Sequence, residues 1–273
     1  MWLIGRNQEI CEREKMPKAK ILLSFDVEEF DLPKEHGADI SLDKGIKVSK
    51  SGLLKILKIL KKQKVPATFF CTANFVEAEP ELIKKIAEGG HEIAGHGVDH
   101  FEPQKNDIEI AKKKIEKVLG KKIVGYRQPR MQPISYGKMK KLGYRYDSSV
   151  NPAFIPGRYN HLDVPRKKYK KSGLIEIPTS VATIFRVPLF WLALHLFPEW
   201  LYYSFVKSSL KKTGYFATYF HPWEFTDLSK YSCVPKYIQH NSGKKLEERL
   251  EKLIIKLKRD DFEFQTYATY AKI

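Results

Sequence analysis

The chain has 273 residues, 42% of them hydrophobic, and this composition predicts a globular protein with a buried core rather than a disordered chain. Its 49 lysines and arginines against 32 acidic residues give a net charge of +17. We expect most of the lysines to form a solvated surface on helix faces; the alternative is an anionic neighbour such as an acidic glycan or a phospholipid headgroup. No basic run is interleaved with aromatic residues as a nucleic-acid groove requires, so we expect no nucleic-acid partner.

Three cysteines, Cys11, Cys71 and Cys233, are widely spaced and predict neither a disulfide framework nor a zinc ribbon. The apolar start of the chain is too short for a signal peptide. We therefore expect an N-terminal arm over residues 1–17 and a single domain over 18–273. The expected location is cytoplasmic, with binding at the membrane periphery as an alternative.

Strands and helices are predicted to alternate for most of the length. The predicted strands are 20–25, 66–72, a short segment before His96, 123–126, 143–147, 174–177, 215–220 and 263–266. The predicted helices are 49–62, 80–87, 107–119, 135–142, an apolar segment over 187–208 broken by Pro198, and 246–257. A long loop rich in proline, glycine and lysine is expected over 151–172. The alternation is typical of an α/β fold of parallel strands covered by helices.

Two histidines, His96 and His100, stand four residues apart. If a helical turn follows the preceding strand, both imidazoles lie on one face and can bind one metal ion. Alone, the pair fits two exposed or capping histidines equally well. A carboxylate would complete a familiar hydrolytic zinc site, and the acidic segment 26–29 ends the first apolar run.

Four polar residues, Asp26, His96, Arg127 and His221, each follow a predicted strand directly. In a barrel of parallel strands, the carboxyl ends converge on the face that carries the active site. The chain has no Gly-x-Gly-x-x-Gly after a strand, no phosphate-binding Gly-Lys-Ser/Thr and no Gly-x-Ser-x-Gly. Nucleotide-binding and serine-hydrolase classes therefore lack support.

Four ordered motifs resemble those of the polysaccharide deacetylases, also called carbohydrate esterase family four, over roughly residues 20–266. They are Leu23–Asp26, His91–His100, Arg127–Pro129 and Tyr219–Pro222. The resemblance implies a distorted (β/α) barrel of about seven parallel strands. It also implies hydrolysis of N- or O-acetyl groups on sugars, usually with a divalent metal.

The metal ligands implied by this resemblance are Glu28, His96 and His100. The ion would be zinc, with cobalt, nickel or iron as alternatives, because such a ligand set accepts all four. Most members have two adjacent aspartates in the first motif, whereas this chain has Val27 in the second place. A branch of the family carries the acidic residue one step later, which implies Glu28; Glu29 is the alternative if the strand has already ended.

Acid and base roles are implied in the same way. Asp26 would be the general base, with Arg127 holding it ionised and oriented. His221 would protonate the leaving nitrogen from the opposite side of the cleft. Pro129 and Trp223 would contact substrate, although Trp223 fits simple packing equally well.

Several neighbouring residues have structural interpretations. His91 is expected to be a hydrogen-bonded structural histidine, and Asp99 and Asp147 are expected to cap turns. Glu224 could orient His221.

Two further departures from the family pattern mark a branch. Gly97 follows His96 where many members have Ser or Thr, and Arg130 stands where Tyr is common. Gly97 together with the segments 146–149 and 221–224 resembles one branch of the family. That branch holds capsule and exopolysaccharide-locus deacetylases and some ring amidohydrolases.

The apolar segment Val187–Tyr203 is too short and too interrupted to span a bilayer. We favour a barrel helix with a large buried face; the alternative is an interfacial segment on anionic lipid.

Three functions remain open at this stage. The first is a metal-dependent deacetylase that acts on acetylated amino sugars of a cell-surface polysaccharide or its precursor, in which the glycan could be lipid-linked. The second is a deformylase or ring-amide hydrolase of the same branch. The third is a catalytically silent barrel that binds carbohydrate.

Overall fold

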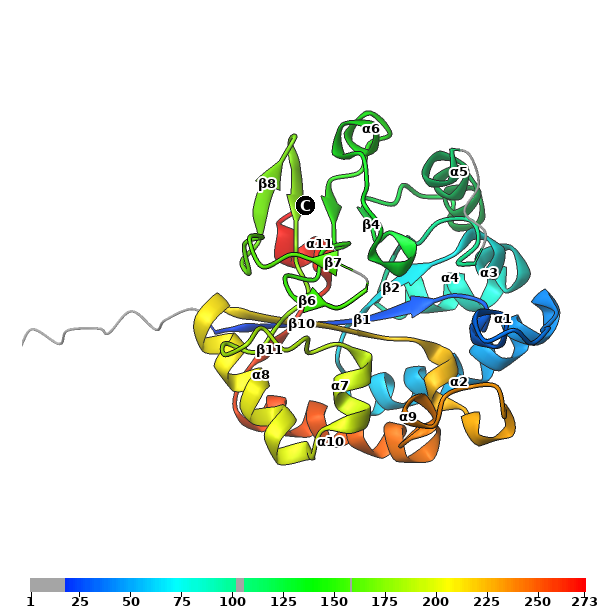
Figure 1. The fold of residues 1–273 in the computed structure, drawn as a ribbon. Helices are drawn as coiled ribbons and strands as arrows, with labels where there is room; N and C mark the ends of the chain where they lie inside the picture. The colour runs from blue at the N-terminus through cyan, green and yellow to red at the C-terminus, as the bar shows by residue number, and fades with distance from the viewer. Residues whose placement is uncertain (1–17, 102–105, 158) are drawn as a thin grey trace, which may run out of the picture.

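The computed structural model describes residues 18–101, 106–157 and 159–273; the expected arm over 1–17, with Cys11, lies outside them. One mixed sheet organises the described residues, with strand order β10-β1-β2-β3-β4-β5-β9-β8 and β11 beside β1. The strands from β10 to β9 in this order pair in parallel, and β8 pairs antiparallel with β9. The sheet curls into a half-barrel (Figure 1), which confirms the predicted α/β fold and distorted (β/α) barrel.

The strands of this sheet are β1 (Lys20–Val27), β2 (Thr68–Cys71), β3 (Glu92–Gly95), β4 (Gly125–Tyr126), β5 (Tyr146–Asp147), β8 (Tyr169–Lys171), β9 (Leu174–Glu176), β10 (Tyr215–Phe220) and β11 (Glu263–Phe264). All of the strands predicted from the apolar runs are present. β1 extends two residues beyond its prediction, so Asp26 lies inside the strand, opposite Phe70 of β2. A buried arginine partner, described below, allows this carboxylate to continue an apolar strand.

Helices cover the sheet: α1 (Leu32–Glu35), α2 (Leu42–Gln63), α3 (Ala73–Ala78), α4 (Pro80–Glu88), α5 (Asp107–Leu119), α6 (Tyr136–Lys141), α7 (Trp191–Leu196), α8 (Glu199–Thr213), α9 (Lys236–Gln239), α10 (Lys244–Arg259) and α11 (Tyr267–Ala271). Short 3₁₀ turns are η1 (Pro129–Met131), η2 (Pro222–Phe225) and η3 (Leu228–Lys230). In Figure 1, α2, α8 and α10 lie along one side of β1 and β10, and α4 and α5 lie beyond β2 and β4.

Local sequence explains the helix limits. α2 begins seven residues before its prediction, because the Ser41 side chain accepts a hydrogen bond from the Lys44 amide and the first turn is largely exposed and polar. α5 has the predicted bounds and ends at Gly120 with a positive φ. α3 was not predicted, since its six residues are too few for a helical repeat.

Helix α2 packs very closely against the backbone of η2 at Gly52. A Cβ atom placed on Gly52 would lie 1.7 Å from the carbonyl oxygen of Pro222. Glycine is therefore required for α2 to pack against η2, and this contact fixes the segment that carries His221.

The predicted loop over 151–172 is in part wrong. It contains an antiparallel pair, β6 (Phe154–Ile155) with β7 (Tyr159–Asn160), and ends in β8. Each of these strands has only two or three residues, too few to show the alternation of a strand.

The apolar segment Val187–Tyr203 forms α7 and the start of α8, separated at Pro198 as expected. Leu189, Leu194 and Tyr202 are buried in the main core. Among the described residues, no helix is both long enough and apolar enough to cross a membrane. These three side chains form the buried face of the segment, whereas Leu196 and Trp200 of the same segment are exposed.

Candidate metal centre

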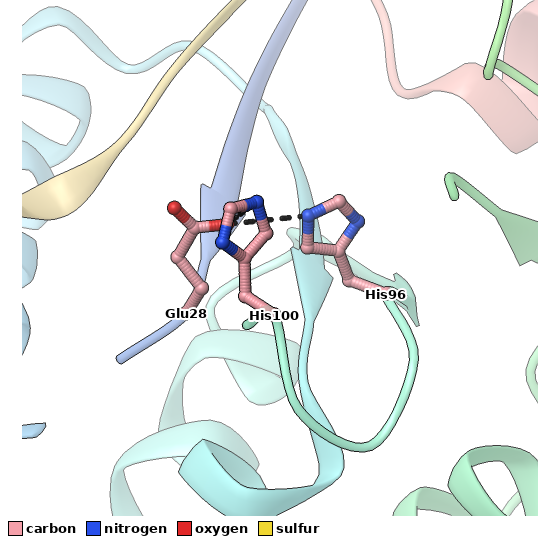
Figure 2. A group of neighbouring side chains, drawn as sticks. All are labelled: Glu28, His96 and His100. Atoms are coloured by element: carbon pink, nitrogen blue, oxygen red, sulfur yellow. Dashed lines mark ion pairs between the residues drawn. The ribbon is translucent and has the colours of Figure 1, made fainter. Parts of the chain in front are cut away.

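Three side chains meet at the carboxyl edge of the sheet. Glu28 follows β1, His96 follows β3, and His100 lies in the next loop (Figure 2). The Oε2 atom of Glu28 lies 3.3 Å from Nε2 of His96 and 3.4 Å from Nε2 of His100. These atoms offer three candidate ligands for one ion.

The loop between the two histidines does not form a helical turn. It turns instead at Gly97, whose φ is +78°, and an added Cβ would lie 2.6 Å from Oδ2 of Asp107. Asp107 accepts a hydrogen bond from the Val98 amide, and Asp99 caps the end of the loop by accepting from the Phe101 amide. A left-handed glycine thus brings His100 back toward His96.

Each histidine is oriented through its other ring nitrogen. Nδ1 of His96 lies 2.8 Å from the Arg127 carbonyl oxygen, and Nδ1 of His100 lies 2.8 Å from Oδ2 of Asp31. A carbonyl or a carboxylate accepts only, so Nδ1 carries the proton in both rings. The Nε2 atoms of both rings therefore face Glu28 and are the ring nitrogens that a metal ion would bind, which is the arrangement of metal-binding histidines.

The donor set fits a divalent metal. Oε2 of Glu28 is buried and has no hydrogen-bond partner among the described residues, whereas Oε1 accepts from the Trp223 indole at 3.1 Å. Ligands about 2.0 Å from a tetrahedral ion lie about 3.3 Å apart, close to the two observed separations. Burial alone would raise the pKa of Glu28, but the neighbouring imidazoles, His100 first, lower it to about 2. An oxygen held ionised and unpartnered is suited to a cation.

Glu29, the alternative ligand, points elsewhere. Its carboxylate accepts from the Thr72 hydroxyl at 2.7 Å and from the His100 amide at 3.3 Å. The structure therefore brings Glu28, and not Glu29, to the histidine pair. Glu29 instead fastens the loop that carries His100.

Asp26 and Arg127 form a buried ion pair next to this cluster. Nη1 of Arg127 lies 2.5 Å from Oδ1 of Asp26. Nε of Arg127 donates to the Ser148 carbonyl at 3.0 Å, and Nη2 donates to the Tyr267 hydroxyl at 3.1 Å. Arg127 is completely buried and its guanidinium lies 4.0 Å from the Phe70 ring centroid. These contacts fix the Asp26 carboxylate, which still lines the cleft.

His221 directly follows β10 and faces Glu28. Its Nε2 lies 3.9 Å from Oε1 of Glu28, and its Nδ1 lies 2.8 Å from Oε1 of Glu224. The His221 ring stacks on Trp223 with centroids 4.7 Å apart, and Trp191 packs edge-on against both. The suggestion that Glu224 could orient His221 agrees with this geometry.

These residues line one cleft of about 400 Å³. Its lining includes Asp26, Glu28, His96, His100, His221 and Trp223 among the predicted residues, with Asp31, Glu35, Arg130, Phe190, Trp191 and Tyr219 besides. Arg127 lies behind Asp26. Pro129, predicted to contact substrate, packs against Gly97 and lines no part of the described cleft.

Three further residues named from the sequence, His91, Arg130 and Asp147, make structural contacts. His91 accepts a hydrogen bond from the Ala67 amide at 3.2 Å and packs edge-on against Phe69, away from the metal cluster. Arg130 has a φ of 58° and pairs with Glu35 at 2.7 Å on the rim of the cleft. Asp147 caps a turn by accepting from the amide and hydroxyl of Ser149.

The prediction for Asp147 omitted its neighbour Glu176. Both carboxyl groups are fully buried and share a hydrogen bond. Burial, and then the charge of Asp147, raise the pKa of Glu176 well above its ordinary value, so the native state retains a proton that the unfolded chain releases. Stability linked to Glu176 is complete below the unfolded pKa and falls as pH rises above it.

We predict that Glu176→Gln weakens this pH dependence. In urea unfolding between pH 5 and pH 9, the variant should lose less stability than the wild-type protein, while Glu29, whose pKa burial raises to about 7, contributes equally to both. The exposed Glu88→Gln change is the control and should leave the slope unchanged. Equal slopes in wild type and Glu176→Gln would contradict the shared-proton interpretation.

The half-barrel and the two-histidine, one-carboxylate cluster at its carboxyl edge define a fold and site class found in metal-dependent hydrolases. The sequence model of the polysaccharide deacetylases matches residues 13–146, and that of a domain of unknown function, DUF3473, matches residues 148–272. The first match confirms the resemblance to the polysaccharide deacetylase family over residues 13–146. The boundary between the two matches falls at Asp147, the last residue of β5. Both matched segments contribute strands to the same sheet.

Known proteins of similar sequence and structure agree. A peptidoglycan deacetylase of Helicobacter pylori is 30% identical over 118 residues, which cover 40% of each chain. A protein from Mycobacterium smegmatis assigned as a polysaccharide deacetylase has a TM-score of 0.64 at 19% identity, covering 94% of this chain and 91% of that one. The Puue allantoinase has a TM-score of 0.63 at 13% identity, covering 98% and 97%. The chain thus matches less than half the length of the curated relative and shares the fold of the two solved structures.

Proposed function

We propose that this chain is a metal-dependent hydrolase that removes N-acetyl groups from amino sugars of a cell-surface polysaccharide or its precursor. The observation that carries the proposal is the convergence of Glu28 Oε2 with two Nε2 atoms, beside the Asp26–Arg127 pair and opposite His221. Zinc is the preferred ion. We further propose that residues 18–273 act as one catalytic domain in the cytoplasm.

The chain's own residues account for the steps of amide hydrolysis. A divalent ion held by Glu28, His96 and His100 would act as a Lewis acid toward the amide carbonyl and the attacking water. Asp26 accepts the proton of that water, and Arg127 keeps its carboxylate in place. His221 donates a proton to the leaving nitrogen, and Glu224 holds its ring toward the cleft.

The aromatic wall favours a sugar substrate. Phe190, Trp191, Tyr219 and Trp223 line the cleft with His221 and offer flat apolar faces. Such faces stack on the apolar side of a pyranose ring or enclose an acetyl methyl group. Relatives named as peptidoglycan and chitooligosaccharide deacetylases support the same substrate class.

Acetate release tests the proposal directly. The zinc-loaded protein would be incubated with N-acetylated chito-oligosaccharides and peptidoglycan fragments, and with a ureide ring in parallel. Acetate from the glycans, absent in His221→Ala, supports deacetylation; cleavage of the ring alone favours the ring-amide alternative. Bound zinc without turnover of any probe would favour a silent carbohydrate-binding barrel.

Peripheral contact with an anionic membrane is also part of the proposal. The side chains of Ile184 and Phe185 are 68% and 93% exposed at the tip of a turn in which Phe185 has a φ of 57°. Arg186 fastens this turn through three backbone carbonyls, those of Pro152, His161 and Val164. An apolar tip held rigidly on a basic protein suits insertion between lipid headgroups.

We predict that the Ile184→Ser/Phe185→Ser double variant binds anionic vesicles more weakly. Each apolar side chain buried in the lipid layer contributes about 1.5–3 kcal/mol, so affinity should fall at least about tenfold. Flotation with phosphatidylglycerol vesicles at low salt measures the change. Leu54→Ser, at another exposed apolar position on α2, is the matched control. Absence of wild-type flotation would remove membrane contact from the proposal.

A further inference from the structure

His195 lies outside the cleft, on α7, and is completely buried behind Glu224. Its Nε2 lies 2.7 Å from Oε2 of Glu224, and its Nδ1 lies 2.8 Å from the carbonyl oxygen of His240. The other carboxylate oxygen of Glu224, Oε1, accepts from both the backbone amide and Nδ1 of His221. One buried carboxylate therefore joins two imidazoles, of which His221 alone reaches the cleft.

The hydrogen-bond partners of His195 determine which of its ring nitrogens carry protons. The His240 carbonyl oxygen only accepts, so Nδ1 of His195 carries a proton. Nε2 then faces an oxygen of Glu224 at hydrogen-bond distance, and a lone pair at that position would repel a carboxylate. A second proton must lie between them.

The contacts of Glu224 indicate that the carboxylate accepts and the ring donates. Burial alone would raise the pKa of Glu224, but hydrogen bonds from His195 and then His221 lower it below its ordinary value. Glu224 is thus a carboxylate held between two donors, and each of its oxygens is satisfied. Without His195, Oε2 would be a buried acceptor with no partner, which is costly.

We propose that His195 is a positioning residue for the hydrolysis: by donating to Oε2 of Glu224 it keeps Oε1 directed at His221, and so fixes the ring that protonates the leaving group. This inference rests on the proposed function. His195 itself touches neither the metal cluster nor the cleft, since it is absent from the cleft lining. Its position is fixed further by Asn241, which donates to the His195 carbonyl at 2.7 Å.

Three substitutions separate this role from simple packing. His195→Leu fills the space without a donor, whereas His195→Gln retains an amide that donates to Oε2. His240→Ala is the matched control, because it removes an exposed histidine side chain and leaves the carbonyl that His195 uses. Should His195→Leu fail to fold, His195→Asn replaces it, since its shorter amide does not reach Glu224.

Steady-state deacetylation of an N-acetylated chito-oligosaccharide provides the first readout, with zinc content measured on every variant. We expect His195→Leu to lower kcat by about 10- to 100-fold, with KM within twofold of wild type and zinc retained. His195→Gln should restore kcat to within about threefold of wild type, and His240→Ala should match wild type. An unchanged kcat in His195→Leu would overturn the proposal, as would an equal loss in His195→Gln.

A second readout does not depend on turnover. Long-range ¹H–¹⁵N spectra of the zinc-loaded protein report the proton on Nδ1 of His221. We expect its signal to be sharp in wild type and His195→Gln, and shifted or exchange-broadened in His195→Leu. If wild type hydrolyses no probe but the signal responds in this way, the proposed function fails and the positioning contact stands. A signal identical in all variants would refute the contact.

Discussion

Replacing Glu28 with glutamine should abolish metal binding and lower kcat/KM by at least about 10³-fold. The change keeps the size of the side chain and the acceptor for the Trp223 indole, but it replaces the charged oxygen that faces His96 and His100. A neutral amide is a weak ligand, and two histidines alone do not hold a divalent ion tightly. Metal content by mass spectrometry and acetate release by the same sample measure both losses.

Glu29→Gln is the matched control for this experiment. It alters the adjacent carboxylate, which contacts Thr72 and the His100 amide rather than the histidine rings. We expect the control to retain at least half of the bound metal. Loss of metal in Glu29→Gln with retention in Glu28→Gln would reverse the ligand assignment.

The strands and the edge at which they meet could be predicted because the signals are local. β1 and β10 are short apolar runs, and the polar residue at the end of each stands out against them. A parallel arrangement then places Asp26 and His221 on one face from strand direction alone. Glu28 was assigned from the resemblance to one branch of the family, and the alternation of side chains along a strand is consistent with Glu28, rather than Val27, facing the cleft.

The supporting contacts could not be predicted, because they join residues far apart in sequence that carry no periodic pattern. Asp31 reaches His100 across 69 positions, and His195 reaches Glu224 across 29. Each lies in or beside a very short helix, where neither apolar spacing nor a motif marks a polar residue. The spacing of His96 and His100 also left the backbone between them open, since spacing alone does not distinguish a helical turn from a left-handed glycine at Gly97.

Arg127→Met should lower the free energy of unfolding by about 3–5 kcal/mol. The substitution leaves the Asp26 carboxylate buried without its cation. It also removes the hydrogen bonds that Arg127 donates to Ser24, Ser148 and Tyr267. Removing one partner of a buried ion pair is far more costly than removing both, because an unpaired charge stays in a low-dielectric core. Urea unfolding at pH 7 measures the loss, and kcat/KM should fall with it as Asp26 loses its orientation.

The double variant Asp26→Asn/Arg127→Met separates the two roles of this pair. It removes both charges, so it should recover about 2 kcal/mol of the stability lost in Arg127→Met. Activity should not recover, since asparagine cannot accept the proton of the attacking water. Recovery of stability without activity would show that the pair is retained for catalysis at a structural cost. A double variant no more stable than Arg127→Met would mean that the arginine acts through its hydrogen bonds to Ser148 and Tyr267, and not through the charge of Asp26.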